Sequence, residues 1–346
     1  MIELLRTVKV VGLRPMLRLR RAQRLAWPGM LNGFYSTRIM QALFNVGFFD
    51  ELGEKGTISP HEFATARALD VAVLRSLCDA MFAFGVLDRR GERYALGRKG
   101  RSLVEVGRGW FDGVYGYQDL VNGLEGMLRK EHEYQRDVNR RLVYVARGSG
   151  QIESRIYFPL AIDYIRRHGF HRALDLGCGD GTFLRHLCRR VPGANGCGVD
   201  VSPEAIADGK AQAQAEGLAD RVHLLTEDIS KLVDVPPELN GVDVATTFFV
   251  LHELLYSGPL RVIDFLKGFR RNFPGVPLLV FEVDRPTPDE MRRRPGMAIP
   301  YYLQHDLSHQ KPIAKEEWRP IFEAAGFESI HQRHLAFARS VIFTLQ

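Results

Sequence analysis

The second half of the chain alternates short apolar runs with helical segments, and this alternation constrains the fold more than any other feature. Strand-like runs occupy residues 172–177, 196–201, 221–229, 242–249 and 277–284. Strands joined by crossover helices pair in parallel, so the pattern predicts an α/β fold with a doubly wound, mostly parallel sheet. Two final runs, "FESIHQRHLA" and "RSVIFTLQ", are joined by a short turn and predict an antiparallel pair that completes a seven-stranded sheet.

The first run leads into a glycine-rich loop, "LDLGCGDGTFL", which contains Asp175, Gly177, Gly179 and Gly181. Glycines at this point let the backbone approach a ligand at a helix N-terminus. The dinucleotide fingerprint has a third glycine where this chain has Thr182. Asp175 would repel a pyrophosphate, but it suits a ligand with a positive charge. The loop therefore favours S-adenosylmethionine, which carries an ammonium and a sulfonium group, over a dinucleotide.

This loop resembles the first motif of the class I S-adenosylmethionine-dependent methyltransferases. Later acids fall in the same order as in that family, because Asp200 ends the second run and Asp228 with Ile229 ends the third. The resemblance implies that Asp200 binds the ribose hydroxyls and that Asp228 and Ile229 contact the adenine. The cofactor residues that the resemblance implies are Asp175, Gly177, Cys178, Gly179, Asp200, Val201, Asp228, Ile229 and Phe248.

Residues 31–105 are predicted to form three helices and a hairpin that turns at Gly91, the element order of a winged-helix domain. The third helix carries Asp70, Arg75 and Asp79, a face without excess positive charge, which favours packing or dimerisation over DNA binding. "ALFNVGFFDEL" is similar to the dimerisation domain that precedes the methyltransferase domain in one branch of the family. The resemblance implies a homodimer and four parts: a basic arm (1–30), a winged-helix dimerisation domain (31–105), linker helices (106–155) and the methyltransferase domain (156–346).

Positive charge is concentrated in the first thirty residues, which contain seven Arg and Lys side chains and one acid. Residues 31–346 carry forty charges of each sign, so the formal net charge of +6 belongs to the arm. Nucleic-acid enzymes more often have a basic stripe through their folded domains, which disfavours a transcription regulator. No apolar run has the length of a membrane span, and four cysteines without a CxxC pair fit a reducing compartment. We therefore expect a cytoplasmic protein with a small-molecule substrate and neither nucleic acid nor membrane as partner.

The fourth run leads into "FFVLHELL", which places His252 and Glu253 at the carboxyl end of a central strand, where ligands bind in such sheets. The Asn/Asp-Pro-Pro-aromatic tetrad of nucleic-acid amino-methyltransferases is absent from this position. In O-methyltransferases that this architecture resembles, the matching histidine is a general base that removes a hydroxyl proton. Glu282, at the end of the fifth run, is expected to orient His252 by the same resemblance.

A second interpretation makes His252 a metal ligand. His305 lies in "YYLQHDLSHQ", and with His252 and Glu253 it would form a two-histidine, one-carboxylate set with open positions for a chelating substrate. His309 could replace His305 if the segment is helical, because it lies four residues further on. This set resembles that of the α-keto acid C-methyltransferases that act on phenylpyruvate or 2-ketoarginine. The resemblance implies one bound metal ion, iron or zinc.

The favoured prediction is methylation of C3 of a small α-keto acid, whose enolate a Lewis-acidic metal would stabilise. The two histidines of "LQHDLSH" favour it, since a plain O-methyltransferase has no need of them. The alternative is O-methylation of a phenolic or other hydroxyl with His252 as base. A binding module without catalysis is the non-enzyme alternative, and the intact glycine loop together with His252 argues against it. The side chain of the keto acid is left open.

Overall fold

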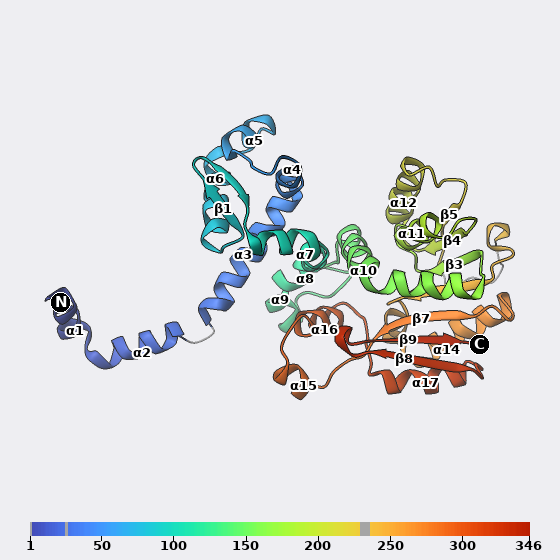
Figure 1. Cartoon of the computed structure of the whole chain (residues 1–346). Coiled ribbons are helices and arrows are strands. Elements are labelled where there is room, and N and C mark those ends of the chain that lie inside the picture. The colour runs from blue at the N-terminus through green and yellow to red at the C-terminus, as the bar shows by residue number, and fades with distance from the viewer. Residues whose placement is uncertain (1, 25–26, 229–235) are drawn as a thin grey trace. The chain divides into compact units, whose positions relative to one another are not determined.

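The computed structural model describes residues 2–24, 27–228 and 236–346 (Figure 1). The chain divides into two compact units, Met1–Phe111 and Asp112–Gln346, and helix α7 (Arg98–Gly116) contains the boundary. In these described ranges no helix is both long enough and apolar enough to cross a membrane. The four parts predicted from the sequence stay predictions.

The N-terminal unit is helical with one small hairpin. Its elements are α1 (Ile2–Val11), α2 (Leu13–Arg24), α3 (Trp27–Asn45), α4 (Phe48–Lys55), α5 (Pro60–Ala66), α6 (Val71–Ala83), β1 (Leu87–Arg90), β2 (Arg93–Leu96) and the first part of α7. The Ser59 side chain caps α5, and Pro60 occupies its first turn. Strands β1 and β2 pair antiparallel around Gly91, whose φ of 62° suits glycine, so the predicted hairpin is confirmed. The winged-helix assignment stays a prediction.

Apolar residues at helical spacing form the core of this unit. Helix α6 buries Leu74, Cys78 and Met81, which lie on one face because they are four and three residues apart. They belong to one cluster with Phe48 and Phe63, whose ring centroids are 5.3 Å apart in an edge-to-face arrangement. The spacing that predicts these helices is therefore also the spacing of the face that they bury.

The C-terminal unit alternates helices and strands. Before its sheet lie α8 (Gln118–Asn122), α9 (Leu124–Leu128) and α10 (Leu142–His168). The sheet region contains β3 (Arg172–Leu176), α11 (Thr182–Arg190), β4 (Asn195–Asp200), α12 (Pro203–Ala215), β5 (Val222–Thr226), η2 (Pro237–Leu239), β6 (Val244–Phe248), α13 (Leu251–Leu254), η3 (Leu255–Ser257), α14 (Pro259–Asn272) and β7 (Leu278–Val283). The last elements are α15 (Pro288–Arg293), α16 (Ala298–Leu307), α17 (Lys315–Ala324), β8 (Ile330–Leu335), η4 (Ala336–Ala338) and β9 (Ser340–Leu345).

The seven strands form one sheet in the order β5-β4-β3-β6-β7-β9-β8. The five strands from β3 to β7 pair in parallel, whereas β9 pairs antiparallel with both β7 and β8. The predicted mostly parallel, seven-stranded α/β sheet with an antiparallel pair at its edge is thus confirmed. The strand order reverses between β3 and β6, and this reversal is the position at which such sheets bind ligands.

Helices cover both faces of this sheet (Figure 1). Helices α10, α11 and α12 pack on one face, where Phe183, Leu184 and Phe281 belong to one buried cluster. Helices α14 and α17 pack on the other face, around Leu266 and Trp318. The two apolar cores lie on the faces of the sheet. Polar side chains gather at the carboxyl ends of β3, β4 and β6.

Candidate active site

The glycine loop after β3 has a backbone that needs its glycines. Gly177, Gly179 and Gly181 have φ values of 79°, 55° and 69°, a left-handed conformation that side chains disfavour. A Cβ at Gly177 would lie 2.5 Å from a methyl group of Val250, and one at Gly181 would lie 2.8 Å from Leu224. Gly181 then forms the N-cap of α11, so the loop brings open backbone to a helix N-terminus.

Two carboxylates flank this loop. Asp175 is 2% exposed, and Thr246 Oγ1 donates to its Oδ1 at 2.8 Å. Burial raises the pKa of Asp175 to about 7; the hydrogen bond from Thr246 opposes this rise and the charge of Asp200 adds to it. Asp200 accepts from the backbone N–H of Gly179 and of Ser202, each at 2.9 Å. The predicted ribose-binding acid therefore also ties the loop to the end of β4.

The other predicted cofactor residues lie around the same edge. Cys178 is buried, and its Sγ would lie 2.7 Å from a Cβ placed on Gly198. Phe248 stacks on Phe281 with ring centroids 4.5 Å apart. Val201 is exposed, and Asp228 follows the end of β5. Ile229 lies outside the described residues. The side chains of Cys178 and Phe248 are therefore core residues.

His252 and Glu282 form a buried pair at the ends of β6 and β7. His252 is 1% exposed, Glu282 is fully buried, and His252 Nδ1 lies 2.8 Å from Glu282 Oε2. Glu282 Oε1 also accepts from the backbone N–H of His252 at 3.2 Å. Burial lowers the pKa of His252, but the charge and hydrogen bond of Glu282 outweigh it, so this pKa lies above its usual value. Because Nδ1–H faces the carboxylate, Nε2 is the ring atom left for a ligand or a proton.

His305 reaches the same place from α16. Its ring centroid lies 5.1 Å from that of His252, and its Nδ1 lies 2.6 Å from the carbonyl oxygen of Tyr301. Burial, and then the neighbouring charge of His252, hold the pKa of His305 well below its usual value, so this imidazole is neutral. The structure therefore brings two of the three predicted metal ligands together.

Glu253, the third predicted ligand, is engaged by groups that the sequence did not reveal. Its Oε1 accepts from Arg140 Nη1 at 2.8 Å and from Gln310 Nε2. Desolvation raises the pKa of Glu253, but the charge and hydrogen bond of Arg140 outweigh it, and this pKa lies below its usual value. In the described part of the chain, no group of three or more His, Cys, Asp or Glu side chains is arranged to hold a metal ion.

Arg140 and Gln310 are therefore site residues that sequence reasoning missed. Arg140 Nε donates to the Tyr134 hydroxyl at 2.8 Å, and the Tyr117 hydroxyl donates to Gln310 Oε1 at 3.1 Å. Arg140 lies 113 residues from Glu253, and Tyr117 lies 193 residues from Gln310. No local pattern marks contacts over such separations.

His309 does not take the position of His305. Helix α16 ends at Leu307, and His309 adopts a left-handed backbone with a φ of 54°. Its ring stacks on Tyr256 at 4.4 Å and meets Tyr134 edge-on at 5.0 Å. The helical spacing that would make His309 an alternative ligand is thus interrupted two residues before His309.

Aromatic side chains lie beside the two histidines. Tyr157, from α10, lies edge-on to Phe249 at 4.8 Å, and Tyr301 stacks on His305 at 4.0 Å. Phe249 has a φ of 58°, an unusual value for a bulky residue, directly after β6. Such strain is often stored at functional sites, where surrounding packing holds it. The carboxyl end of β6 therefore combines strained backbone, buried titratable groups and an apolar wall.

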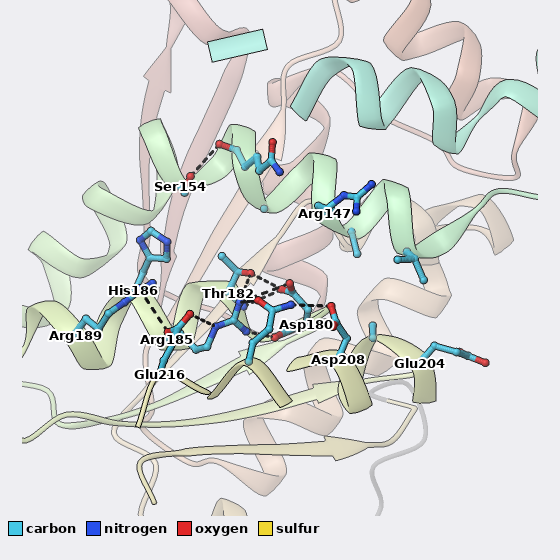
Figure 2. A pocket seen from close by; sticks show the side chains of 16 residues that line it. Arg147, Ser154, Asp180, Thr182, Arg185, His186, Arg189, Glu204, Asp208 and Glu216 are labelled. Atoms are coloured by element: carbon cyan, nitrogen blue, oxygen red, sulfur yellow. Dashed lines mark hydrogen bonds and ion pairs between the residues drawn. The ribbon is translucent and has the colours of Figure 1, made fainter. Parts of the chain in front are cut away.

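A cavity of about 340 Å³ lies on the helical side of the glycine loop, between α10, α11 and α12 (Figure 2). None of the predicted site residues lines it. Figure 2 shows Arg185 pointing into a polar network there. Its Nη1 donates to the Asp180 carbonyl at 2.5 Å, and its Nη2 donates to Thr182 Oγ1 at 3.0 Å and to Gln212 at 2.5 Å. The buried guanidinium of Arg185 therefore stabilises the glycine loop through hydrogen bonds on the side of the loop that faces α11 and α12.

Comparisons with known proteins agree with this geometry. The methyltransferase-domain family matches residues 174–272. A 2-ketoarginine methyltransferase of Streptomyces arginensis is 29% identical over 315 residues, which cover 88% of each chain. An indolepyruvate C-methyltransferase of Streptomyces griseus is 24% identical over 311 residues, which cover 87% of this chain and 89% of that protein.

Solved structures share the fold along nearly the whole chain. The mitomycin 7-O-methyltransferase MmcR has a TM-score of 0.66 at 16% identity, covering 95% of this chain and 99% of that chain. Human N-acetylserotonin methyltransferase in complex with SAM has a TM-score of 0.65 at 18% identity, covering 94% and 97%. The fold is that of the class I methyltransferases. Together with the family match and the relatives, it makes this chain an S-adenosylmethionine-dependent methyltransferase, as predicted.

Proposed function

We propose that S-adenosylmethionine binds at the carboxyl edge of β3, β4 and β5. The support is the left-handed glycine loop, whose backbone is open at a helix N-terminus, and the two acids beside it. Asp175 and Asp200 give this edge negative charge, which suits the ammonium and sulfonium groups of the cofactor. Asp228 lies after the next strand, where the adenine of the cofactor would reach it.

We propose further that the enzyme methylates C3 of a small α-keto acid. The observation that carries this proposal is the pair of imidazoles, His252 and His305, in one buried place with both Nδ1 atoms engaged. A plain O-methyltransferase needs one histidine as base and has no use for a second neutral one. Two relatives that align along most of the chain are named for 2-ketoarginine and indolepyruvate, which are both α-keto acids.

The two histidines suit a metal ion, although the described side chains do not form a group of three ligands as they stand. His252 and His305 each have Nε2 available, because the other ring nitrogen faces a carboxylate or a carbonyl, as is usual for metal-binding histidines. Both contacts to Glu253 use Oε1, and Oε2 has no partner within the described residues. His252, His305 and Glu253 would hold the ion, and iron and zinc both suit this set. When bound, the metal supplies Lewis acidity toward the oxygens of the keto acid, which makes the C3 proton easier to remove.

The protein groups around this place suit an anionic acceptor with an apolar side chain. Arg140 presents a cation beside Glu253, so the carboxylate of a keto acid would find an opposite charge there. Tyr157, Phe249 and Tyr301 form an apolar wall that excludes water from the reacting carbon. These residues orient the acceptor and keep the site dry, while C3 attacks the methyl group of the cofactor.

Metal analysis tests this proposal. Purified enzyme should contain about one equivalent of iron or zinc per chain, as a three-ligand site implies. The His305→Ala variant should lose the metal and the activity while it still binds S-adenosylmethionine, because the cofactor site uses other strand ends. The matched control is His309→Ala, which removes a nearby histidine that stacks on Tyr256, and it should keep both metal and activity.

The alternative function is O-methylation of a hydroxyl, with His252 as general base. The observation that favours it is the His252–Glu282 pair, since a carboxylate on Nδ1 raises the basicity of Nε2. This function predicts a metal-free, fully active enzyme in which His305→Ala is tolerated and a phenol gains the methyl group. That combination of results would contradict the keto-acid proposal and establish the alternative.

We also propose that the enzyme is a homodimer that assembles through its N-terminal unit. The support is apolar surface on α1, α2 and α3, where several large side chains are exposed. The basic arm at residues 1–30 would then belong to the interface.

A further inference from the structure

One face of helix α10 contacts both the glycine loop and the residue that follows β6. Ala146, Gly150, Glu153 and Tyr157 are four, three and four residues apart, so they lie on the same face of the helix. The first two residues of this face contact the glycine loop. The Cβ of Ala146 lies 3.8 Å from the position that a side chain would take at Gly179. A Cβ on Gly150 would lie 3.6 Å from that of Thr182.

The other end of the same face reaches the acceptor side of the site. Tyr157 is 7% exposed, and its ring centroid lies 4.8 Å from that of Phe249, which follows β6, and 6.1 Å from that of Phe281 in β7. Glu153 lies between these two contacts, one turn before Tyr157. Along the helix, Glu153 therefore lies between the residues that contact the glycine loop and the residue that contacts the apolar wall.

Glu153 has no hydrogen bond or ion pair among the described residues, and its side chain is partly buried. The charges nearest to it are the carboxylates of Asp175 and Asp180, and burial together with these charges raises its pKa to about 8. The basic side chains nearby have other partners, since Arg147 pairs with Asp112 and Arg185 binds the loop. Without a cation, this carboxyl group is therefore mainly the neutral acid near pH 7, and a cation that joined it would favour the ionised form.

We propose that Glu153 receives the α-ammonium group of the methionine part of S-adenosylmethionine. This inference rests on the proposed cofactor site at the glycine loop. The cofactor carries two cationic centres, but only the ammonium group has N–H groups that can donate hydrogen bonds to a carboxylate. A cofactor on the loop would direct its methyl group toward the acceptor at the end of β6. Its amino acid part would then lie beside the loop, where α10 presents Glu153.

Three ligands separate the two cationic centres in binding calorimetry. S-adenosylmethionine has ammonium and sulfonium, S-adenosylhomocysteine has only the ammonium, and 5′-methylthioadenosine has neither. A charge-assisted hydrogen bond contributes about 1.5–3 kcal/mol. Glu153→Gln should therefore lower the affinity for S-adenosylmethionine and for S-adenosylhomocysteine about 10- to 100-fold. The affinity for 5′-methylthioadenosine should not change. Glu153→Asp, which keeps the charge on a shorter side chain, should recover part of the loss.

Two controls accompany the variant. Asp163→Asn removes one negative charge from the same helix, at a site that pairs with Arg166 and Arg167, and should leave all three affinities unchanged. Thermal unfolding without ligand near pH 7 should show Glu153→Gln about as stable as the natural chain, since the amide and the protonated acid are both uncharged beside Asp175. A loss of stability would mean that Glu153 has a structural role and would overturn the proposal.

The remaining outcomes are also decisive. A loss confined to S-adenosylmethionine would place the carboxylate against the sulfonium and overturn the ammonium assignment, and unchanged affinities would overturn it outright. Asp200→Ala tests the underlying site separately, because its carboxylate ties the loop to β4. If Asp200→Ala weakens all three ligands and Glu153→Gln weakens none, only the inference about Glu153 fails. If Asp200→Ala has no effect, the cofactor site itself is wrong.

Discussion

The chemistry of single residues is clearest at His252, where burial and charge oppose each other. An imidazole this buried would ordinarily stay neutral and have a lowered pKa, yet Glu282 reverses the shift through a hydrogen bond of 2.8 Å. Both proposed reactions need His252 neutral, as base or as ligand. Activity should therefore rise as the pH passes upward through the pKa of His252.

Replacing Glu282 by Gln tests this coupling. The amide keeps the shape but removes the negative charge, so burial would dominate and the pKa of His252 would fall. The acidic limb of the pH–activity profile should move to lower pH, and the maximal rate should drop by about 10- to 100-fold, as for other residues that orient a catalytic histidine. The control is Glu323→Gln, an exposed acid on α17 paired with Arg319. A fall in rate without a shift in the profile would mean that Glu282 has only a structural role.

At the scale of elements, helix α12 supports the glycine loop by close approach. A Cβ on Gly209 would lie 2.2 Å from the carbonyl oxygen of Asp180, the same oxygen that accepts from Arg185. Gly209→Ala should therefore displace the loop, cost about 1–3 kcal/mol of the free energy of unfolding, and weaken cofactor binding. Denaturant unfolding and calorimetry measure the two effects.

The matched control for this substitution is Gly268→Ala in α14. A side chain there would meet only the end of Arg271, at 4.0 Å, so the change should stabilise the chain by up to about 1 kcal/mol through helix propensity. Equal effects of the two substitutions would show that the contact between α12 and the loop does not support the cofactor site.

The whole molecule is expected to be a dimer. Met30 and Phe34 on α3 are 73% and 60% exposed, a large apolar surface for one helix. Light scattering should give twice the chain mass of 39.3 kDa, and the double variant Met30→Ser, Phe34→Ser should shift the mass to that of one chain. Phe337→Ser, which removes an equally exposed aromatic from η4 in the other unit, should leave the dimer intact. A natural chain that is monomeric at micromolar concentration would contradict the proposal.

The features that depend on local patterns could be predicted from the order of the residues alone. Alternating apolar runs predict the parallel sheet because buried strands and crossover helices each need a characteristic spacing. The glycines of the loop are recognisable because only glycine tolerates that backbone, and His252 could be placed because it follows a central strand.

Contacts between side chains that are far apart in the sequence became apparent only in the folded chain. The contacts of Glu253 with Arg140 and Gln310, the position of Glu153 among acids, and the exclusion of His309 depend on how α10 and α16 pack against the sheet. Charges attract without a fixed spacing in the chain, so no sequence pattern records their partners. The end of α16 likewise places His309 away from the site that His305 enters. The fold was therefore readable from local physics, whereas the electrostatic partners of the site arise only when distant segments pack together.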